Sequence, residues 1–166
     1  MDTKNFKDLC DRLLKKYGFK KKKTMYYKDG NDGIRCGVYL QRSYYGKVYY
    51  FNYYYFLDNS DVKVFPQYFE ADVYGRITVL SKIKDRDDNY HQTALIEYEL
   101  YEEKELEEYL EKGIQDEILL PIKKGRQVIF DMVKNGTCII YKFRSKEEEE
   151  VMQKLYDFKT GEGQKS

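Results

Sequence analysis

The sequence has 166 residues, the size of one ordinary domain, and is long enough to bury a core without disulfides or a metal ion. Aromatic residues make up 17% of it, and this content excludes a disordered chain in spite of a mean hydropathy of −0.82. The net charge is +1, but residues 1–50 hold 13 Lys and Arg against 5 Asp and Glu. This basic first third predicts either an acidic partner or packing against the acidic remainder of the chain.

The sequence carries no sign of export or membrane insertion. It has no run of about 18 uncharged apolar residues, and its first four residues already include two charges, unlike a signal peptide. Cys10, Cys36 and Cys138 form no CxxC pair, which is typical of reduced, buried thiols. We therefore predict a cytoplasmic protein that does not contact a membrane.

The first predicted element is a helix over residues 4–17. Apolar residues recur there at the spacing that places them on one helix face. They are Phe6, Leu9, Cys10, Leu13, Leu14 and Tyr17. Asp2 or Thr3 can cap its beginning, and Gly18 can end it in the left-handed conformation.

Five segments then predict strands, because they are rich in β-branched and aromatic residues and are bounded by turn residues. They span residues 24–28, 34–41, 47–57, 73–80 and 92–100. The segment 47–57 is apolar on both faces, so we expect it at the centre of the sheet. We expect Gly75 to break the fourth segment.

Mainly helical patterns follow. Residues from 102 onward predict a helix that Pro121 ends or kinks, and residues 128–133 predict a second helix. Residues 137–143 are strand-like, and a capping box at Ser145 begins a last helix that runs to residue 158.

This order of elements predicts an α+β fold rather than alternating βαβ units. The expected architecture is a mostly antiparallel, Tyr-rich sheet of about five strands, packed by an N-terminal helix and C-terminal helices. Residues 1–159 are predicted to form a single domain, and residues 160–166 a flexible tail.

Several local patterns occur in the order known for one bacterial family. They are YGFKKK at residues 17–22, MYYK at 25–28, VYLQRS at 38–43, YFNY at 50–53, GRI at 75–77 and a helix over 102–121 that ends at LP. Over residues 1–122 the chain resembles the domain-of-unknown-function 4304 family. Residues 123–166 resemble an extension, and the tryptophans of the family's middle part are absent. The resemblance implies the fold, but it brings no activity and no catalytic residue.

The sequence has no motif for catalysis, metal binding or cofactor binding. His91 is the single histidine, and Asp85, Asp87 and Asp88 lack the glycine and the distal glutamate of a calcium loop. A P-loop, a dinucleotide fingerprint and a nucleophile elbow are all missing. We therefore predict no metal site and no cofactor.

The densest charge cluster is basic. Residues 15–23 contain six lysines, four of them consecutive, and lie near tyrosine-rich strands. Cations and aromatic rings at turns beside strands are commonly used for binding. The candidate contact residues are Lys20, Lys21, Lys22, Lys23, Arg42, Tyr44 and Tyr45.

Three functions are compatible with these features. The favoured one is a non-catalytic protein-binding module, for which an immunity-like role, the neutralisation of a toxin by binding, is one form. The second is single-stranded nucleic-acid binding, with the lysines as a basic rim around a stacking platform, which requires the tyrosines of residues 49–55 to be exposed. The third is an enzyme with an unrecognised site, which a cleft joining Arg76, Glu97 or Tyr98 would support.

Overall fold

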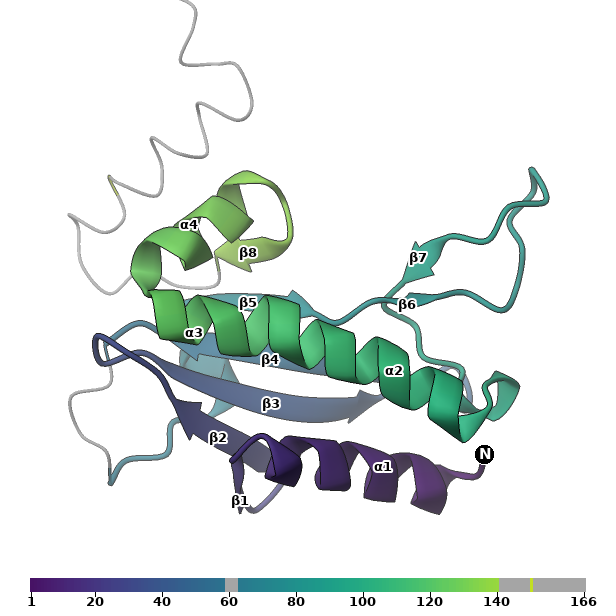
Figure 1. The fold of residues 1–166 in the computed structure, drawn as a ribbon, viewed down its shortest axis with the longest axis horizontal. Helices are drawn as coiled ribbons and strands as arrows, with labels where there is room; N and C mark the ends of the chain where they lie inside the picture. Colours follow the sequence, from purple (N-terminus) through teal and green to yellow (C-terminus); the bar gives the residue numbers. More distant parts are fainter. Residues whose placement is uncertain (59–62, 141–149, 151–166) are drawn as a thin grey trace, which may run out of the picture.

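A computed structural model of the protein describes residues 1–58, 63–140 and 150. Six strands form one antiparallel sheet in the order β1-β2-β3-β4-β5-β8. They are β1 (Lys20–Lys22), β2 (Met25–Asp29), β3 (Arg35–Arg42), β4 (Tyr49–Phe56), β5 (Val73–Arg76) and β8 (Cys138–Ile140). The helices are α1 (Thr3–Lys16), α2 (Glu103–Gly113), α3 (Leu120–Lys124) and α4 (Arg126–Lys134). Figure 1 shows α1, α2 and α3 on one face of the sheet, which confirms the predicted α+β fold.

α1 forms where the apolar spacing predicts it. The Asp2 carboxylate caps the helix by accepting a hydrogen bond from the Asn5 backbone N–H at 2.7 Å. Gly18 follows the helix with a φ of 82°, the left-handed conformation expected at a helix end. The buried face of α1 packs into the main core through Phe6, Leu9, Cys10, Leu13 and Leu14.

β4 is a central strand, as its two apolar faces predict. It lies between β3 and β5 and pairs with both. Tyr53 and Tyr55 pack into the core beneath the helices, whereas Tyr54 and Phe56 pack into a smaller core on the opposite face. Because successive side chains of a strand point to opposite sides, other segments of the chain cover β4 on both faces.

Gly75 does not break its strand, contrary to the prediction. It pairs with Tyr53 on one side and with Cys138 on the other, inside the sheet. The ring of Tyr53 lies across it, so a Cβ at position 75 would meet Tyr53 Cζ at 2.4 Å. The glycine therefore provides space for a tyrosine ring, and β5 ends instead at Arg76.

The fifth predicted strand is mostly wrong. β6 (Val79–Leu80) and β7 (Gln92–Thr93) pair as a small ribbon that projects from the sheet in Figure 1. Beyond β7 the backbone makes one isolated bridge, between Ile96 and Tyr49, and then enters the 3-10 turn Tyr98–Leu100 (η2). Ile96 and Tyr98 are buried two residues apart, so they imitate the alternation of a strand without its pairing.

Pro121 does not end its helix. α2 continues through a π-helical segment, Ile114–Leu119, into α3, which ends before Gly125 at a φ of 107°. Pro121 lies in the first turn of α3, where a missing N–H is tolerated best.

The π-helical segment places a carboxyl group against the tyrosines of β4. Tyr53 Oη donates to Glu117 Oε2 at 2.7 Å, and Tyr55 Oη donates to the backbone carbonyl oxygen of Glu117. Burial raises the pKa of the Glu117 carboxyl above its ordinary value, and the hydrogen bond from Tyr53 partly opposes this effect.

The stability of the Glu117→Gln variant relative to the wild type should therefore increase as pH rises. A group whose pKa is higher in the folded state than in the unfolded state contributes stability at low pH. This contribution is lost as pH rises through the folded-state pKa. We expect the melting temperature of the variant to gain on that of the wild type between pH 4 and pH 7. Glu111→Gln is the control of opposite sign, because hydrogen bonds from Lys16 and Tyr17 lower the pKa of Glu111. A constant difference between wild type and Glu117→Gln across this range would contradict the prediction.

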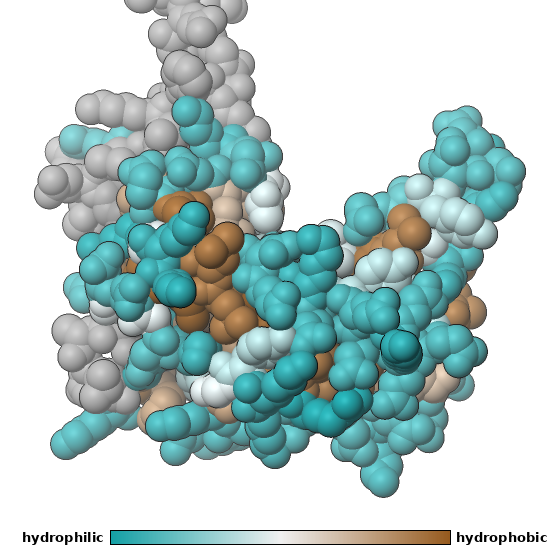
Figure 2. All heavy atoms as spheres, viewed as in Figure 1, coloured by the Kyte–Doolittle hydropathy of each residue, from teal (hydrophilic) through white to brown (hydrophobic). Residues whose placement is uncertain are grey.

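Figure 2 shows the helix side of the molecule as mainly hydrophilic, with an apolar area over α3 and α4. In the part of the chain that the structure describes, no helix combines the length and the apolar character needed to cross a membrane. The predicted helix over residues 145–158 and the tail over 160–166 lie outside the described residues. The single domain over residues 1–159 accordingly stays a prediction.

Candidate binding site

Two hollows meet at Tyr39 and Arg42. The first, the tyrosine pocket, has a volume of about 690 Å³ and is lined by Tyr39, Gln41, Arg42, Ser43, Tyr44, Gly46, Lys47, Tyr54 and Tyr68. The second, the basic groove, has a volume of about 740 Å³ and is lined by Lys7, Asp8, Asp11, Lys15, Lys21, Lys23, Thr24, Tyr26, Tyr39, Leu40, Arg42 and Tyr49. Because the hollows share two residues, one bound partner can reach both.

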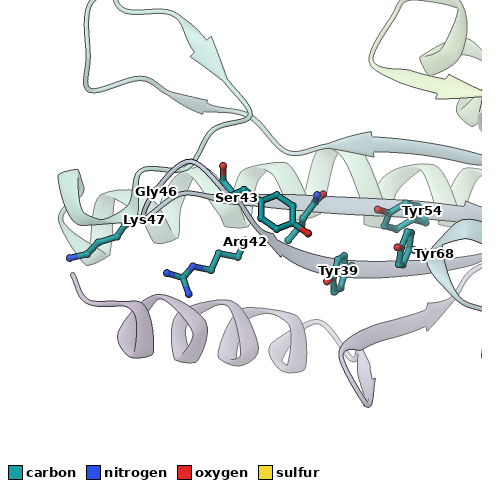
Figure 3. Close-up of a pocket in the computed structure, with 9 residues that line it drawn as sticks. Tyr39, Arg42, Ser43, Gly46, Lys47, Tyr54 and Tyr68 are labelled. Atoms are coloured by element: carbon teal, nitrogen blue, oxygen red, sulfur yellow. The ribbon is translucent and has the colours of Figure 1, made fainter.

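The tyrosine pocket has an aromatic end and a cationic end. Tyr39 and Tyr54 come from β3 and β4, and Tyr68 comes from the 3-10 turn Tyr68–Glu70 (η1) between β4 and β5. The rings of Tyr39 and Tyr68 are nearly parallel with centroids 5.4 Å apart, and the Tyr54 centroid is 5.7 Å from that of Tyr68. Figure 3 shows these three rings grouped together, with Arg42 and Lys47 toward the other end.

Side chains of β2 and β3 hold the segment that carries Tyr68 in place. Tyr27 Oη donates a hydrogen bond to the carbonyl oxygen of Pro66, and the Tyr27 ring packs on Phe65 with centroids 5.2 Å apart. The guanidinium of the buried Arg35 lies 5.0 Å from the centroid of the Phe65 ring. These contacts fix the tyrosine wall before any ligand binds.

A buried asparagine orients the amide of Gln41 in the pocket lining. Arg76 Nε donates to Asn52 Oδ1 at 2.9 Å, which directs the amide nitrogen of Asn52 toward Gln41 Oε1 at 3.0 Å. The oxygen of Gln41 is therefore engaged, and its NH₂ group makes no hydrogen bond within the described residues. This leaves Gln41 as a donor.

Positive charge exceeds negative charge along the basic groove. Asp11 is 2.7 Å from Lys15 Nζ and 3.6 Å from Lys21 Nζ, and the hydrogen bond from Lys15 lowers the pKa of this carboxyl. Lys7, Lys23 and Arg42 form no ion pair within residues 1–58, 63–140 and 150. Their charge is available to an incoming acidic group.

The β3–β4 hairpin tip, residues 43–46, carries two exposed tyrosines. The backbone N–H of Ser43 donates to the carbonyl of Val48 at 2.9 Å, and that of Tyr45 donates to Ser43 Oγ at 3.2 Å. These bonds order the tip although Tyr44 and Tyr45 are 95% and 98% exposed. Tyrosine and arginine are enriched among residues that dominate binding energy, so Arg42 and the tip together form a candidate recognition element.

A comparison with protein families places this site in a known kind of domain. The model of the domain of unknown function DUF4304 matches residues 10–122. The chain belongs to the DUF4304 family. No curated protein and no solved structure matches it. Apart from Lys7 and Asp8, every residue that lines either hollow lies in the matched part, so the site belongs to the DUF4304 domain.

The DUF4304 domain brings five of the seven candidate contact residues to this site. Lys21, Lys23 and Arg42 line the basic groove, and Arg42 also lines the tyrosine pocket together with Tyr44. Tyr45 lies beside Tyr44 at the hairpin tip.

Lys20 and Lys22 line neither hollow. The sequence indicated a turn at the lysine run, and this was wrong. Lys20–Lys22 pair with β2 as the edge strand β1, and Lys23 follows with a φ of 57°. Alternation along β1 directs Lys20 and Lys22 away from the side of Lys21, and Lys22 Nζ lies 4.9 Å from the centroid of the Phe65 ring.

The long aromatic strand offers no stacking platform. Tyr49, Tyr53, Tyr54 and Tyr55 are at most 5% exposed. Tyr50 is partly buried, and the guanidinium of Arg76 lies 4.2 Å from the centroid of its ring. The most exposed aromatic groups that the DUF4304 domain presents beside the tyrosine pocket are instead those of the hairpin tip.

The residues named for an enzyme site do not converge. Arg76 lies with Asn52 and Tyr50 on the sheet face opposite the helices, whereas Tyr98 stacks on Phe6 beneath the helices, with ring centroids 5.1 Å apart. Burial raises the pKa of the Cys138 thiol to about 12, so this thiol stays protonated. Among the described residues, no three His, Cys, Asp or Glu side chains gather as a possible metal site.

Sequence reasoning missed the walls of the tyrosine pocket. Tyr39 and Gln41 alternate with the buried Val38 along β3, a signal that could have placed them on the opposite face. Tyr68 lies in a segment without periodicity, so nothing in the sequence predicts that it packs on Tyr39.

Proposed function

We propose that this DUF4304 protein is a non-catalytic protein-binding module that holds an acidic partner at the hairpin tip and the basic groove. The observation that carries the proposal is the position of Tyr44 and Tyr45, which are almost fully exposed beside Arg42, where the two hollows meet. Exposed tyrosines bury a large area on binding with little loss of side-chain entropy, and arginine adds several hydrogen-bond donors.

The charge of the groove supports an acidic partner. Lys7, Lys23 and Arg42 carry positive charge and form no ion pair in the described part of the chain. Such a surface accelerates encounter with acidic proteins and disfavours basic ones. The immunity-like role stays a prediction within this proposal.

The same groove favours protein over nucleic acid. Asp8 and Asp11 also line it, and a phosphate backbone would meet these carboxylates, whereas a protein can place its own cations opposite them. The burial of the tyrosines in β4 also removes the surface on which bases would stack.

The test is a pull-down of the tagged protein from the cells that naturally contain it, with and without nuclease. We expect one stoichiometric protein that survives nuclease, weakens at raised salt and is lost with the double variant Tyr44→Ala/Tyr45→Ala. Recovery of RNA or DNA that depends on Lys21 and Lys23, or capture of the same protein by the double variant, would overturn the proposal.

A further inference from the structure

The tyrosine pocket has the chemistry of a site for one side chain of the partner. Resting on the function proposed above, we infer that the partner inserts an aromatic side chain that is adjacent in sequence to Asp or Glu. The aromatic ring packs at the end formed by Tyr39, Tyr54 and Tyr68, and the carboxylate binds the Arg42 guanidinium.

Size and shape fit such a group. The volume of about 690 Å³ lies within the range of roughly 300–1,000 Å³ typical of small-ligand sites. Tyr68 is 38% exposed, so part of its ring remains open to a partner although it also packs on Tyr39. Aromatic rings pair favourably at offset-stacked or edge-to-face geometry beyond the area they bury.

Polarity selects an anion. No Asp or Glu lines the pocket, whereas Arg42 and Lys47 both do. Lys47 already pairs with Glu99 at 2.7 Å, which leaves Arg42 as the cation without an ion pair in the described residues. The NH₂ of Gln41 adds a neutral donor. A carboxylate accepts from both kinds of donor, and a guanidinium matches its geometry.

The pocket is built before binding. Tyr27 holds the segment of Tyr68 through Phe65 and Pro66, and the Arg76–Asn52–Gln41 chain of hydrogen bonds holds the amide of Gln41. A site whose groups are already ordered loses less entropy when it binds.

Continuity with the basic groove points to a peptide segment of the partner. The pocket and the groove share Tyr39 and Arg42, where β3 continues beyond its last pair with β2, so a chain lying along the groove can pass around this edge of β3 to the pocket. The cations of the groove would then bind further acidic residues that flank the aromatic one.

The experiment uses the peptide acetyl-Asp-Trp-Asp-amide as a probe of the full chain. The protein has no tryptophan, so tryptophan fluorescence reports the probe alone. We expect saturable binding with a shifted emission, and Arg42→Gln or Tyr68→Ala should each weaken it by about tenfold or more. Lys20→Gln is the matched control, because it removes the same charge from a surface residue that lines neither hollow and should leave the affinity nearly unchanged.

Equal weakening by Arg42→Gln and Lys20→Gln would overturn the inference, since it would indicate non-specific charge attraction. Equal binding of acetyl-Asn-Trp-Asn-amide would also overturn it, as would the absence of saturation. Far-UV circular dichroism checks that each variant is folded. If Tyr68→Ala still captures the natural partner while Tyr44→Ala/Tyr45→Ala does not, the inference fails and the proposed function stands. If both variants capture the partner, both fail.

Discussion

Replacing Gly75 with alanine should lower the free energy of unfolding by about 3 kcal/mol, the upper part of the usual range for overpacking a core. The new Cβ would meet Tyr53 Cζ and Oη at 2.4 Å. Tyr53 has no free space to move into, because it is fully buried, packs edge-on against Tyr55 and is hydrogen-bonded to Glu117. Urea unfolding followed by circular dichroism measures the loss.

A double-mutant cycle tests the cause of this loss. In a Tyr53→Leu background the side chain that crosses position 75 is shorter, so Gly75→Ala should cost about 1 kcal/mol or less. Thr78→Ala is the control, because Thr78 is exposed just beyond β5. An equal cost of Gly75→Ala in both backgrounds would show that the Tyr53 ring is not the reason for the glycine.

Replacing both Tyr44 and Tyr45 with alanine should weaken the affinity for the natural partner by about 100-fold or more, the effect expected when hot-spot residues are truncated. The two side chains are almost fully exposed, so stability should be nearly unchanged. Isothermal titration calorimetry with the purified partner measures the affinity, and thermal unfolding checks the fold.

Tyr90→Ala is the matched control for this variant. Tyr90 is another exposed tyrosine, but it lies in the connection between β6 and β7, outside both hollows. The Tyr90→Ala variant should bind the partner with the wild-type affinity. A similar loss for Tyr90→Ala, or less than about a threefold loss for the double variant, would contradict a hairpin-centred interface.

The sequence predicted those parts of the fold in which periodicity and burial agree. The amphipathic spacing from Phe6 to Leu14 predicted α1, and the two apolar faces of residues 47–57 predicted the centre of the sheet. It failed where a local signal had a tertiary cause. Gly75 looked like a strand breaker, but the space it leaves is filled by Tyr53 from the neighbouring strand.

The candidate site was predictable only in part, for a similar reason. Tyr44 and Tyr45 lie in a turn pattern between two clear strands, so their exposure followed from the hairpin itself. The tyrosine pocket depends on a contact between Tyr39 and Tyr68, 29 positions apart, and no local pattern encodes it. Likewise, Lys20 and Lys22 share the charge of Lys21, and only strand pairing separates them from it.

The most direct test of the proposed interface is photo-crosslinking from the hairpin tip in living cells. Tyr45 is replaced by p-benzoylphenylalanine in one strain and Tyr90 in another, and the adducts formed under ultraviolet light are identified by mass spectrometry. A protein-binding hairpin predicts one defined protein adduct from position 45 that is absent from position 90 and is reduced by Arg42→Glu. A nucleic-acid adduct, the same adduct from both positions, or no adduct from position 45 would contradict it.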